Sequence, residues 1–440
     1  MRFQSSFPLV WSLLAMAFVS EAYAHRVPFT GLRMPLEQLQ AQVEKEPDSV
    51  ALILGSGPTG LMSAHQLRKM NLFKTIILVG DRSEYTRTNT VTLRPESFPK
   101  LAELELDKAL DSKFYFADDF HFFIHLPKDR KVIAESFPGN PKHIDYSQGN
   151  LLKVLDGPGW PHYAIKIADF ESILAETISA NKMVTFLKGS VQKILTETGK
   201  TKRHSLRLQF DDNGKQRTLD FINPKLILIA EGGGSKTREM MGIDYRPIPE
   251  NETQHWCSGA VSLDGILDQS SMNSRITIVS HELTKTVAFG VFRNSENDLF
   301  LNGKMSEEES KTWTAEDCLR FNAFKILNEE SGFMKMTLPE SPAFLNVSDS
   351  VAGKFDVALN KASSFHSLEN VFLIGDSAGN GSPIGGLGIS LITSVYMDAL
   401  KSLVEGLSRT SAPADVDKVI SDYDARVRQI VEFWHFSLKK

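Results

Sequence analysis

Cysteine is scarce in this chain, and so are long apolar runs and an excess of charge of one sign. Cys257 and Cys318 are the only cysteines in 440 residues and form no CxxC pair, which argues against a cysteine zinc site or a disulfide framework. Whether the two thiols pair with each other stays open. Beyond the N-terminus no run has the length of a membrane span. The 49 lysines and arginines face 54 acidic residues, so the charge gives no reason to expect a nucleic-acid partner. We therefore look for a small-molecule site and predict no metal.

The first 24 residues have the pattern of a secretory signal. Arg2 precedes the apolar run 9–19, and the small-x-small residues 22–24 form a cleavage site before His25. This pattern predicts an exported protein, periplasmic or secreted, with no stable membrane span after processing. A short membrane anchor or a misplaced start codon is the alternative.

A glycine-rich turn between a strand and a helix is the first chemical signal. The apolar run 49–54 predicts a strand, residues 55–60 read GSGPTG, and a helical pattern continues to about residue 70. In such a turn the glycines allow tight bending and close approach to a pyrophosphate, which the helix N-terminus attracts. Proline is tolerated in the first helical turn. The residues expected to bind a dinucleotide here are Gly55, Gly57, Pro58, Thr59 and Gly60. A purely structural glycine turn is the alternative.

The second expected strand, 75–79, is followed by acidic and basic side chains. Asp81 lies close to the spacing at which an acid binds the ribose hydroxyls of a dinucleotide, and Arg82 follows it. Gly80 leaves the register uncertain by one residue. A solvated aspartate at the end of the strand is the alternative.

Two further motifs follow in the order found in one family of flavoproteins. Residues 230–238 (AEGGGSKTR) resemble the A-D/E-G-x-x-S-x-x-R fingerprint of aromatic-ring hydroxylases, and 375–390 (GDSAGNGSPIGGLGIS) resemble their G-D-A-A…P-x-x-G-x-G-x-N fingerprint. From about 48 to 430 the chain thus resembles the p-hydroxybenzoate hydroxylase group of FAD-dependent monooxygenases, also called group A. The resemblance places near FAD the residues Glu231, Gly232, Gly375, Asp376, Pro383, Gly386, Gly388 and Ile389.

The segment 85–95 (YTRTNTVTLRP) is similar to a stretch of MICAL-type flavoprotein monooxygenases. That likeness places Arg87 and Asn89 near the flavin, although a plain surface loop with an arginine fits the segment nearly as well. Three positions depart from the family patterns: Gly379 stands for histidine, Ser390 for asparagine and Glu231 for the commoner aspartate. Lys236 and Arg238 either attract an anionic cofactor or start a solvated helix.

The resemblance and the order of the expected elements together predict the fold. We expect an α/β protein with a Rossmann-like FAD-binding domain, of the p-hydroxybenzoate hydroxylase and glutathione reductase type, and an inserted substrate domain built on a mixed β-sheet. Runs at 190–195, 205–210 and 216–221 predict an antiparallel crossover sheet, with a hairpin turn at Asn213-Gly214. The expected segments are a signal peptide (1–24), a discontinuous FAD domain (48–112, 151–245 and 352–408), a substrate domain (113–150 and 246–351) and a C-terminal helix (413–440).

By resemblance, the function is that of an FAD-dependent oxidoreductase, and more narrowly of a monooxygenase. NADPH or NADH would donate electrons transiently, because no second GxGxxG turn is present. O2 would then form a flavin hydroperoxide that transfers one oxygen atom to a small molecule or an exposed side chain. No catalytic base stands out in the sequence. An oxidase, dehydrogenase or reductase on the same fold is the first alternative, and a binding protein resembling the Rab escort and GDP-dissociation-inhibitor proteins is the second.

Overall fold

Most of the chain from His25 to Phe436 is described by a computed structural model. The described residues are 25–87, 89–94, 96–117, 119–125, 144–145, 151–155, 162–198, 202–248, 253–267, 275–281, 285–293, 296–331, 334, 336–348, 352–381, 387–410 and 412–436. The expected signal peptide lies outside these residues. In the described part no helix is long and apolar enough to cross a membrane, and no cluster of histidine, cysteine and acidic residues could hold a metal.

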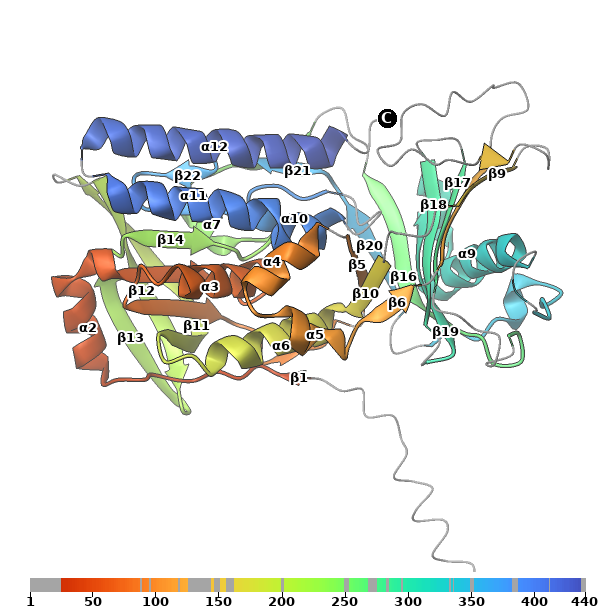
Figure 1. The fold of residues 1–440 in the computed structure, drawn as a ribbon, viewed down its shortest axis with the longest axis horizontal. Helices are drawn as coiled ribbons and strands as arrows, with labels where there is room; N and C mark the ends of the chain where they lie inside the picture. The colour runs from red at the N-terminus through yellow and green to blue at the C-terminus, as the bar shows by residue number, and fades with distance from the viewer. Residues whose placement is uncertain are drawn as a thin grey trace, which may run out of the picture.

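The larger of two bodies is built on an eight-stranded sheet (Figure 1). Its central strands are parallel, and β2 pairs with β3 and β14. These strands are buried at every position, as expected for a parallel sheet with both faces covered. In spatial order the strands are β13 (Lys215–Ile222), β12 (Lys202–Asp212), β11 (Val184–Thr198), β3 (Thr75–Gly80), β2 (Val50–Leu54), β14 (Leu226–Ile229), β23 (Val371–Leu373) and β22 (His366–Ser367).

One strand of this sheet pairs in both directions. The run expected at 190–195 is part of a longer strand, β11, which first pairs parallel with β3 and then antiparallel with β12. Gly189 lies where the antiparallel pairing begins, and a Cβ there would overlap the backbone of Gln209. A bulge between Val191 and Lys193 shifts the register. Glycine at 189 therefore allows β11 and β12 to approach closely.

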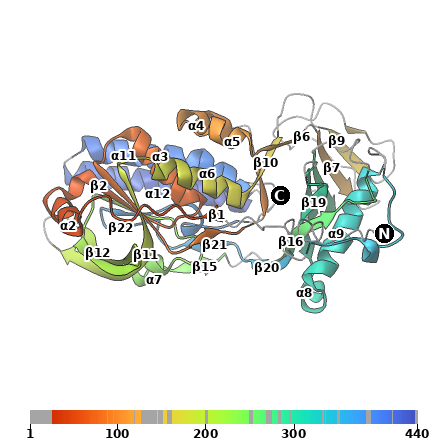
Figure 2. The same cartoon turned by 90° about the horizontal axis from the view of Figure 1, so that it is seen from below.

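Helices cover the larger sheet. Figure 2 shows α3, α6, α11 and α12 on one side of it, with α7 on the other. Between Leu387 and Arg409 the chain forms two helices that break at Ser394. The helices of this body are α2 (Leu36–Lys45), α3 (Pro58–Met70), α4 (Ser97–Glu103), α5 (Asp107–Asp111), α6 (Ile167–Ser179), α7 (Lys236–Met240), α10 (Leu387–Thr393), α11 (Val395–Arg409) and α12 (Pro413–Phe436).

The second body is a separate eight-stranded sheet with the helix α9 (Ala315–Glu330) packed against it (Figure 1). Most of its strands are antiparallel, but β17 and β7 are parallel, so the predicted mixed sheet is present. The short helix α8 (Glu307–Thr312) precedes α9, and both begin with a capping box. In spatial order the strands are β20 (Gly353–Val357), β16 (Gln254–Ser262), β19 (Asp298–Met305), β18 (Lys285–Arg293), β17 (Arg275–His281), β7 (Asp119–His125), β9 (Leu151–Leu155) and β8 (Ile144–Asp145).

Strand pairing differs from the expected segment boundaries at two places. β9 and β20 belong to the second sheet, although 151–245 and 352–408 were expected to contribute to the first body. The reason is geometric: β9 completes a hairpin-like pairing with β7, and β20 adds an edge to β16. A boundary placed by motif spacing misses such strands, because they carry no motif.

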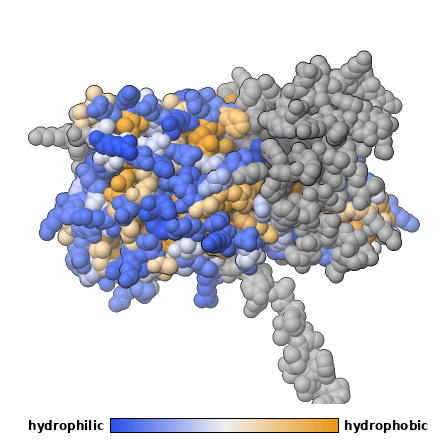
Figure 3. All heavy atoms as spheres, in the orientation of Figure 1, coloured by the Kyte–Doolittle hydropathy of each residue, from blue (hydrophilic) through white to orange (hydrophobic). Residues whose placement is uncertain are grey.

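The described residues also form three small sheets. A three-stranded sheet has the order β5 (Thr90–Leu93), β10 (His162–Lys166) and β6 (Tyr115–Ala117). The pair β1 (His25–Arg26) and β4 (Glu84–Tyr85) ties the start of the described chain to the segment after β3, and β15 (Tyr245–Pro247) pairs with β21 (Asn360–Ala362). On the face drawn in Figure 3, apolar residues of the larger body are scattered among hydrophilic ones.

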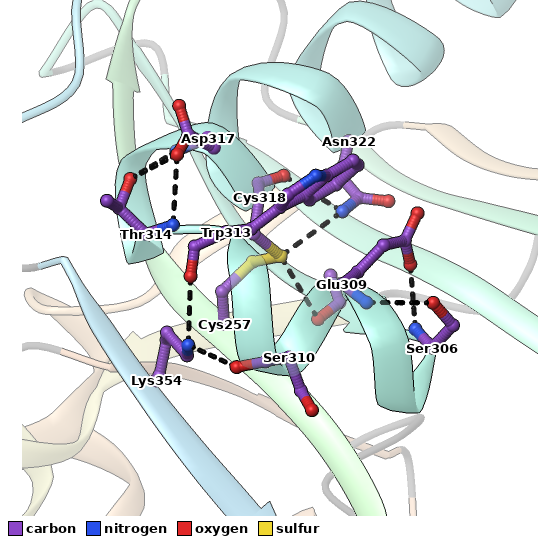
Figure 4. The surroundings of a disulfide bond; sticks show 11 residues. Cys257, Ser306, Glu309, Ser310, Trp313, Thr314, Asp317, Cys318, Asn322 and Lys354 are labelled. Atoms are coloured by element: carbon purple, nitrogen blue, oxygen red, sulfur yellow. Dashed lines mark hydrogen bonds between the residues drawn. A yellow bond between two sulfur atoms is a disulfide. The ribbon is translucent and has the colours of Figure 1, made fainter.

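A disulfide between Cys257 of β16 and Cys318 of α9 fastens the second sheet to its helix (Figure 4). Both cysteines are fully buried, and their Cα atoms are 6.2 Å apart. The Cys318 sulfur also lies near the Asn322 amide, which donates to the Cys318 carbonyl at 2.9 Å. The question that the sequence left open is thereby answered: the two thiols pair.

Candidate cofactor-binding site

The GSGPTG turn adopts the conformation that only glycine permits. Gly55 has φ +111°, and a Cβ there would overlap the Ala230 carbonyl. A Cβ on Gly60 would overlap the Gly55 carbonyl oxygen. The first and third glycines therefore let β2, the turn and α3 pack at backbone contact, as the motif requires.

The turn ends at the start of α3, where backbone amides lack helical partners. Pro58 is the first helical residue, and Leu61 donates the first intrahelical bond, to the Gly57 carbonyl at 3.0 Å. Thr59 and Gly60 have no helical acceptor four residues earlier. Their amides and the helix dipole make this point suited to an anion such as a diphosphate.

Two arginines and a buried glutamate lie beside the second glycine of the motif. A Cβ on Gly57 would be 3.3 Å from Nη2 of Arg82 and 3.8 Å from Oε1 of Glu171. Arg82 and Arg87 both donate to Glu171 Oε1, Arg82 at 2.9 Å. Arg82 and Arg87 thus meet beside the glycine turn, although the sequence had suggested a place near the flavin for Arg87. Glu171, which the sequence reading missed, joins them.

Asp81 directly follows the last residue of β3 and is exposed. Gly80 stands before it because a Cβ there would overlap the Ser56 side chain of the turn. This close approach explains why glycine stands at position 80, where it left the register of Asp81 uncertain. It places Asp81 at the carboxyl end of its strand, on the edge of the sheet where the glycine turn lies.

The second motif forms a self-contained loop at the end of β14. Glu231 accepts from the Ser235 hydroxyl at 2.5 Å, from the Thr237 amide at 3.1 Å and from the Thr237 hydroxyl at 2.8 Å. Its carboxylate therefore organises the start of α7, where Ser235 is the N-cap. The φ of +81° at Gly232 lets the chain turn before that cap.

Arg238 is buried and holds two loops together, so the solvated helix start considered for it from the sequence is wrong. Its side chain donates to the carbonyls of Gly233 at 2.6 Å and Ser377 at 3.1 Å, and its guanidinium lies 3.8 Å from the Tyr245 ring centroid. The Tyr245 hydroxyl in turn donates to the Asp376 carbonyl at 2.8 Å. The second and third motifs are thereby held together.

Asp376 follows β23, on the same edge of the sheet as the glycine turn. Gly375, with φ +64°, abuts Thr59 so closely that a Cβ would overlap its hydroxyl, so the first and third motifs touch. No described residue hydrogen-bonds the Asp376 carboxylate. Burial raises the pKa of Asp376 to about 6, and the charge of Arg87 opposes that shift. A partly enclosed carboxyl with free acceptor atoms suits a sugar-alcohol hydroxyl.

The loop after Asp376 is backed by the C-terminal helix. Pro383 and Gly386 lie outside the described residues, whereas Gly388 and Ile389 belong to α10. A Cβ on Gly379 would be 2.6 Å from Val431 of α12, and one on Gly388 would be 3.1 Å from Trp434. Histidine is therefore sterically excluded at 379. The tight packing against α12 explains why glycine stands at these two positions, and the sequence alone did not reveal this reason.

Asn89 and the segment around it connect the two bodies. The Asn89 amide donates to the Ser258 hydroxyl of β16 at 3.1 Å, and the Arg94 amide donates to the Ser390 hydroxyl of α10 at 3.1 Å. Ser390 thus keeps a polar function where the family pattern has asparagine. The MICAL-like segment therefore contacts both α10 and the second sheet.

The three motifs therefore converge on one edge of the parallel sheet, and the residues there fit an FAD. The helix start and two arginines suit the diphosphate, Asp81 suits a ribose, and Asp376 suits the ribityl chain. Glu171 left only a faint signal in the sequence: it is an acid on the apolar stripe of α6 formed with Leu174, Ala175 and Ile178. Helical periodicity could have marked it as a buried charge in need of partners.

The comparisons with known proteins agree with this geometry. A model of the FAD binding domain family matches residues 48–433. No curated protein matches the sequence significantly. Among solved structures, p-nitrophenol 4-monooxygenase PnpA from Pseudomonas putida DLL-E4 is similar with a TM-score of 0.59 and 18% identity, over 89% of this chain and 87% of that one.

Two further structures show the breadth of the fold. The probable FAD-dependent monooxygenase PqsL from Pseudomonas aeruginosa gives a TM-score of 0.55 at 16% identity, over 88% of this chain and 94% of that one. The flavin-dependent brominase Bmp2 gives 0.62 at 13% identity, over 89% and 88%. At such identities the likeness establishes the fold, and the family match carries the cofactor. The chain belongs to the FAD binding domain family, with the p-hydroxybenzoate hydroxylase-like fold and the oxidoreductase class that its motifs predict.

Proposed function

We propose that this protein is an NAD(P)H- and O2-dependent FAD monooxygenase that adds one oxygen atom to an organic substrate. The observation that carries the proposal is the meeting of all three flavoprotein motifs at one sheet edge, through Gly375 against Thr59 and Arg238 against Ser377. PnpA is a p-nitrophenol 4-monooxygenase and PqsL a probable FAD-dependent monooxygenase, which supports this activity for the shared fold.

The chain's own residues would have three tasks in this reaction. The start of α3, Arg82 and Arg87 would bind the diphosphate, and Asp376 would orient the ribityl chain. The loop ending in α10, backed by α12, would carry the ring and keep water from one side of it. Bound FAD would accept hydride from NAD(P)H and react with O2. A further GxGxxG turn is lacking in the sequence, so the nicotinamide donor would bind only transiently.

The substrate would sit between α10 and the second sheet. The side of that sheet near the three-stranded sheet is apolar, with Ile276, Phe289 and Val291 packed around Ala164. These side chains are buried by the protein itself, and we propose that a substrate bound beside this apolar cluster has an apolar or aromatic part. A small molecule or an exposed side chain of another protein would both satisfy this condition.

We also propose that the protein is exported. Its N-terminal pattern supports this, and so does the buried disulfide, because structural disulfides persist in oxidising compartments. Native protein from the producing cell should begin at His25, as N-terminal mass analysis would show. An intact N-terminus at Met1 in the cytoplasm would contradict the proposal.

The decisive experiment follows electrons and product mass together. The purified chain is loaded with FAD and mixed with NADPH or NADH in air, with organic compounds and bromide supplied. Bleaching of the flavin bands, reoxidation by O2 and a product heavier by one oxygen would support the proposal. A product changed by two hydrogens would instead indicate an oxidase, dehydrogenase or reductase, and a brominated product would indicate a halogenase like Bmp2.

A further inference from the structure

Glu171 lies beside the glycine turn, and a bound dinucleotide does not explain its presence there. Its side chain has no solvent exposure, and it lies on the face of α6 that packs toward α3. A carboxylate at this point repels a diphosphate instead of attracting it. Burying such a charge is costly unless it is paired, so its role must lie in what it pairs with.

Both partners of Glu171 come from the segment that follows β3. Arg82 and Arg87 each donate through Nη2 to the same oxygen, Oε1. The second oxygen, Oε2, is buried without a hydrogen-bond partner among the described residues. One carboxylate thus holds two guanidiniums, and the triad keeps a net positive charge.

The two arginines remain available to a ligand. Their side chains are 34% and 44% exposed, although the carboxylate they share is fully enclosed. Each guanidinium uses Nη2 for Glu171, which leaves Nη1 and Nε for another acceptor. Arg82 Nη2 lies 3.3 Å from the position that a Cβ on Gly57 would take, beside the first turn of α3. Arg87 shares Glu171 Oε1 with it.

We propose that Glu171 is a positioning residue for the FAD diphosphate, which holds Arg82 and Arg87 at the second glycine of the motif before the cofactor arrives. Arginine side chains lose several rotamers when they become ordered. Glu171 fixes these rotamers in the free protein, so diphosphate binding does not have to order them. The inference rests on FAD as the cofactor of the proposed function and does not depend on oxygen transfer.

The test is the FAD dissociation constant of the full chain freed of flavin, followed by flavin fluorescence well below the unfolding temperature. Glu171→Gln keeps the size of the side chain and removes its charge. We expect it to weaken FAD binding by roughly tenfold or more. Glu176→Gln, an exposed glutamate on the same helix, is the matched control and should bind FAD like the wild type.

A double-mutant cycle separates positioning from a general structural role. In the Arg82→Met/Arg87→Met background, Glu171→Gln should change FAD affinity by less than about twofold, because there is nothing left to position. An equal loss in both backgrounds would overturn the proposal. So would a Glu171→Gln variant that loses thermal stability yet binds FAD normally, or one that binds FAD more tightly.

Glu171→Asp covers the case in which the glutamine variant does not fold. It keeps the buried charge but shortens its reach by one methylene, so it should fold and still bind FAD more weakly. Normal affinity in that variant would contradict the proposal. Wild-type protein that binds FAD but inserts no oxygen would refute the proposed function alone, because the affinity ratios remain measurable.

Discussion

The two large sheets differ in how far their sequences predict what they bind. Around the cofactor site the glycines at 55 and 60 stand where a Cβ would overlap backbone atoms, and those at 80 and 375 stand where it would overlap the side chains of Ser56 and Thr59. In the second sheet Gly290 and Gly303 also make close contacts, but only with side chains and away from the glycine turn. A site built from backbone leaves a fixed motif, whereas a wall built from side chains leaves only an alternation of apolar residues.

This difference explains why the cofactor could be predicted and the substrate could not. The diphosphate is the same in every FAD protein, so the residues that approach it are constrained in kind and spacing. The second sheet must match one particular substrate, and any apolar residue of the right size can serve. The predictions below test the two regions and the link between them.

The largest effect is expected when a single methyl group is added to the glycine turn of the larger body. Gly60→Ala would force a Cβ into the Gly55 carbonyl, which only movement of the turn or of α3 can relieve. We expect FAD binding to be lost and the free energy of unfolding to fall by about 3 kcal/mol, measured by the flavin absorption band and urea unfolding. Gly353→Ala is the control, because nothing lies within 4 Å of a Cβ at that position of the second sheet. Normal FAD binding by Gly60→Ala would remove the distinction drawn between the two sheets.

The next effect concerns the charge cluster that joins the regions. Arg293 is buried, pairs with Asp298 and Glu296 of the second sheet, and donates to Thr90 of β5 at 3.3 Å. Arg293→Met would leave the half-buried Asp298 without its cation. The free energy of unfolding should therefore fall by about 3 kcal/mol, as chemical denaturation would measure.

The matched control for that variant is Arg246→Met, which removes an arginine from an exposed pair with Asp244. This control should change stability by less than about 0.5 kcal/mol. Equal effects of the two substitutions would show that the cluster does not couple the sheets.

The disulfide should stabilise the second region without shaping the first. Replacing Cys257 and Cys318 by alanine removes a cross-link between residues 61 positions apart, and we expect a loss of about 3 kcal/mol in unfolding free energy. The flavin band and FAD affinity should stay unchanged below the unfolding temperature. A reductant should destabilise the wild type but have no further effect on the double variant. If the substitutions abolished FAD binding in folded protein, the two regions would be less independent than their cores indicate.

The smallest effect is a pH dependence that originates at Asp376. Its pKa of about 6 in the folded protein lies above the usual value of an unfolded aspartate. Folding therefore favours the protonated form of Asp376. The stability that this protonation contributes to the folded protein is complete below about pH 4 and is lost as the pH rises through 6. Relative to the wild type, the free energy of unfolding of Asp376→Asn should rise by up to about 2 kcal/mol between pH 4 and 7. This is less than the full pKa shift implies, because the carboxyl is partly exposed.

Flavin-free protein is the material for this measurement, with urea unfolding repeated across that pH range. Arg87→Met should steepen the same dependence, because the arginine charge opposes the shift. If the free energies of unfolding of the wild type and Asp376→Asn differed by the same amount at all pH values, the pH dependence would not come from the titration of this carboxyl.

The sequence by itself determined the backbone-dictated part of this protein: the glycine turn at 55–60, the order of the three motifs, the FAD-binding fold and most strand positions. These follow from local rules, since a glycine at a forced close approach and a buried run of branched residues can be recognised without knowing their neighbours. Only the tertiary structure decided which side chains meet. It paired Cys257 with Cys318, made Arg238 a clamp and brought Glu171 to Arg82 and Arg87, because these contacts join elements far apart in the chain, and a single sequence carries no measure of distance in space.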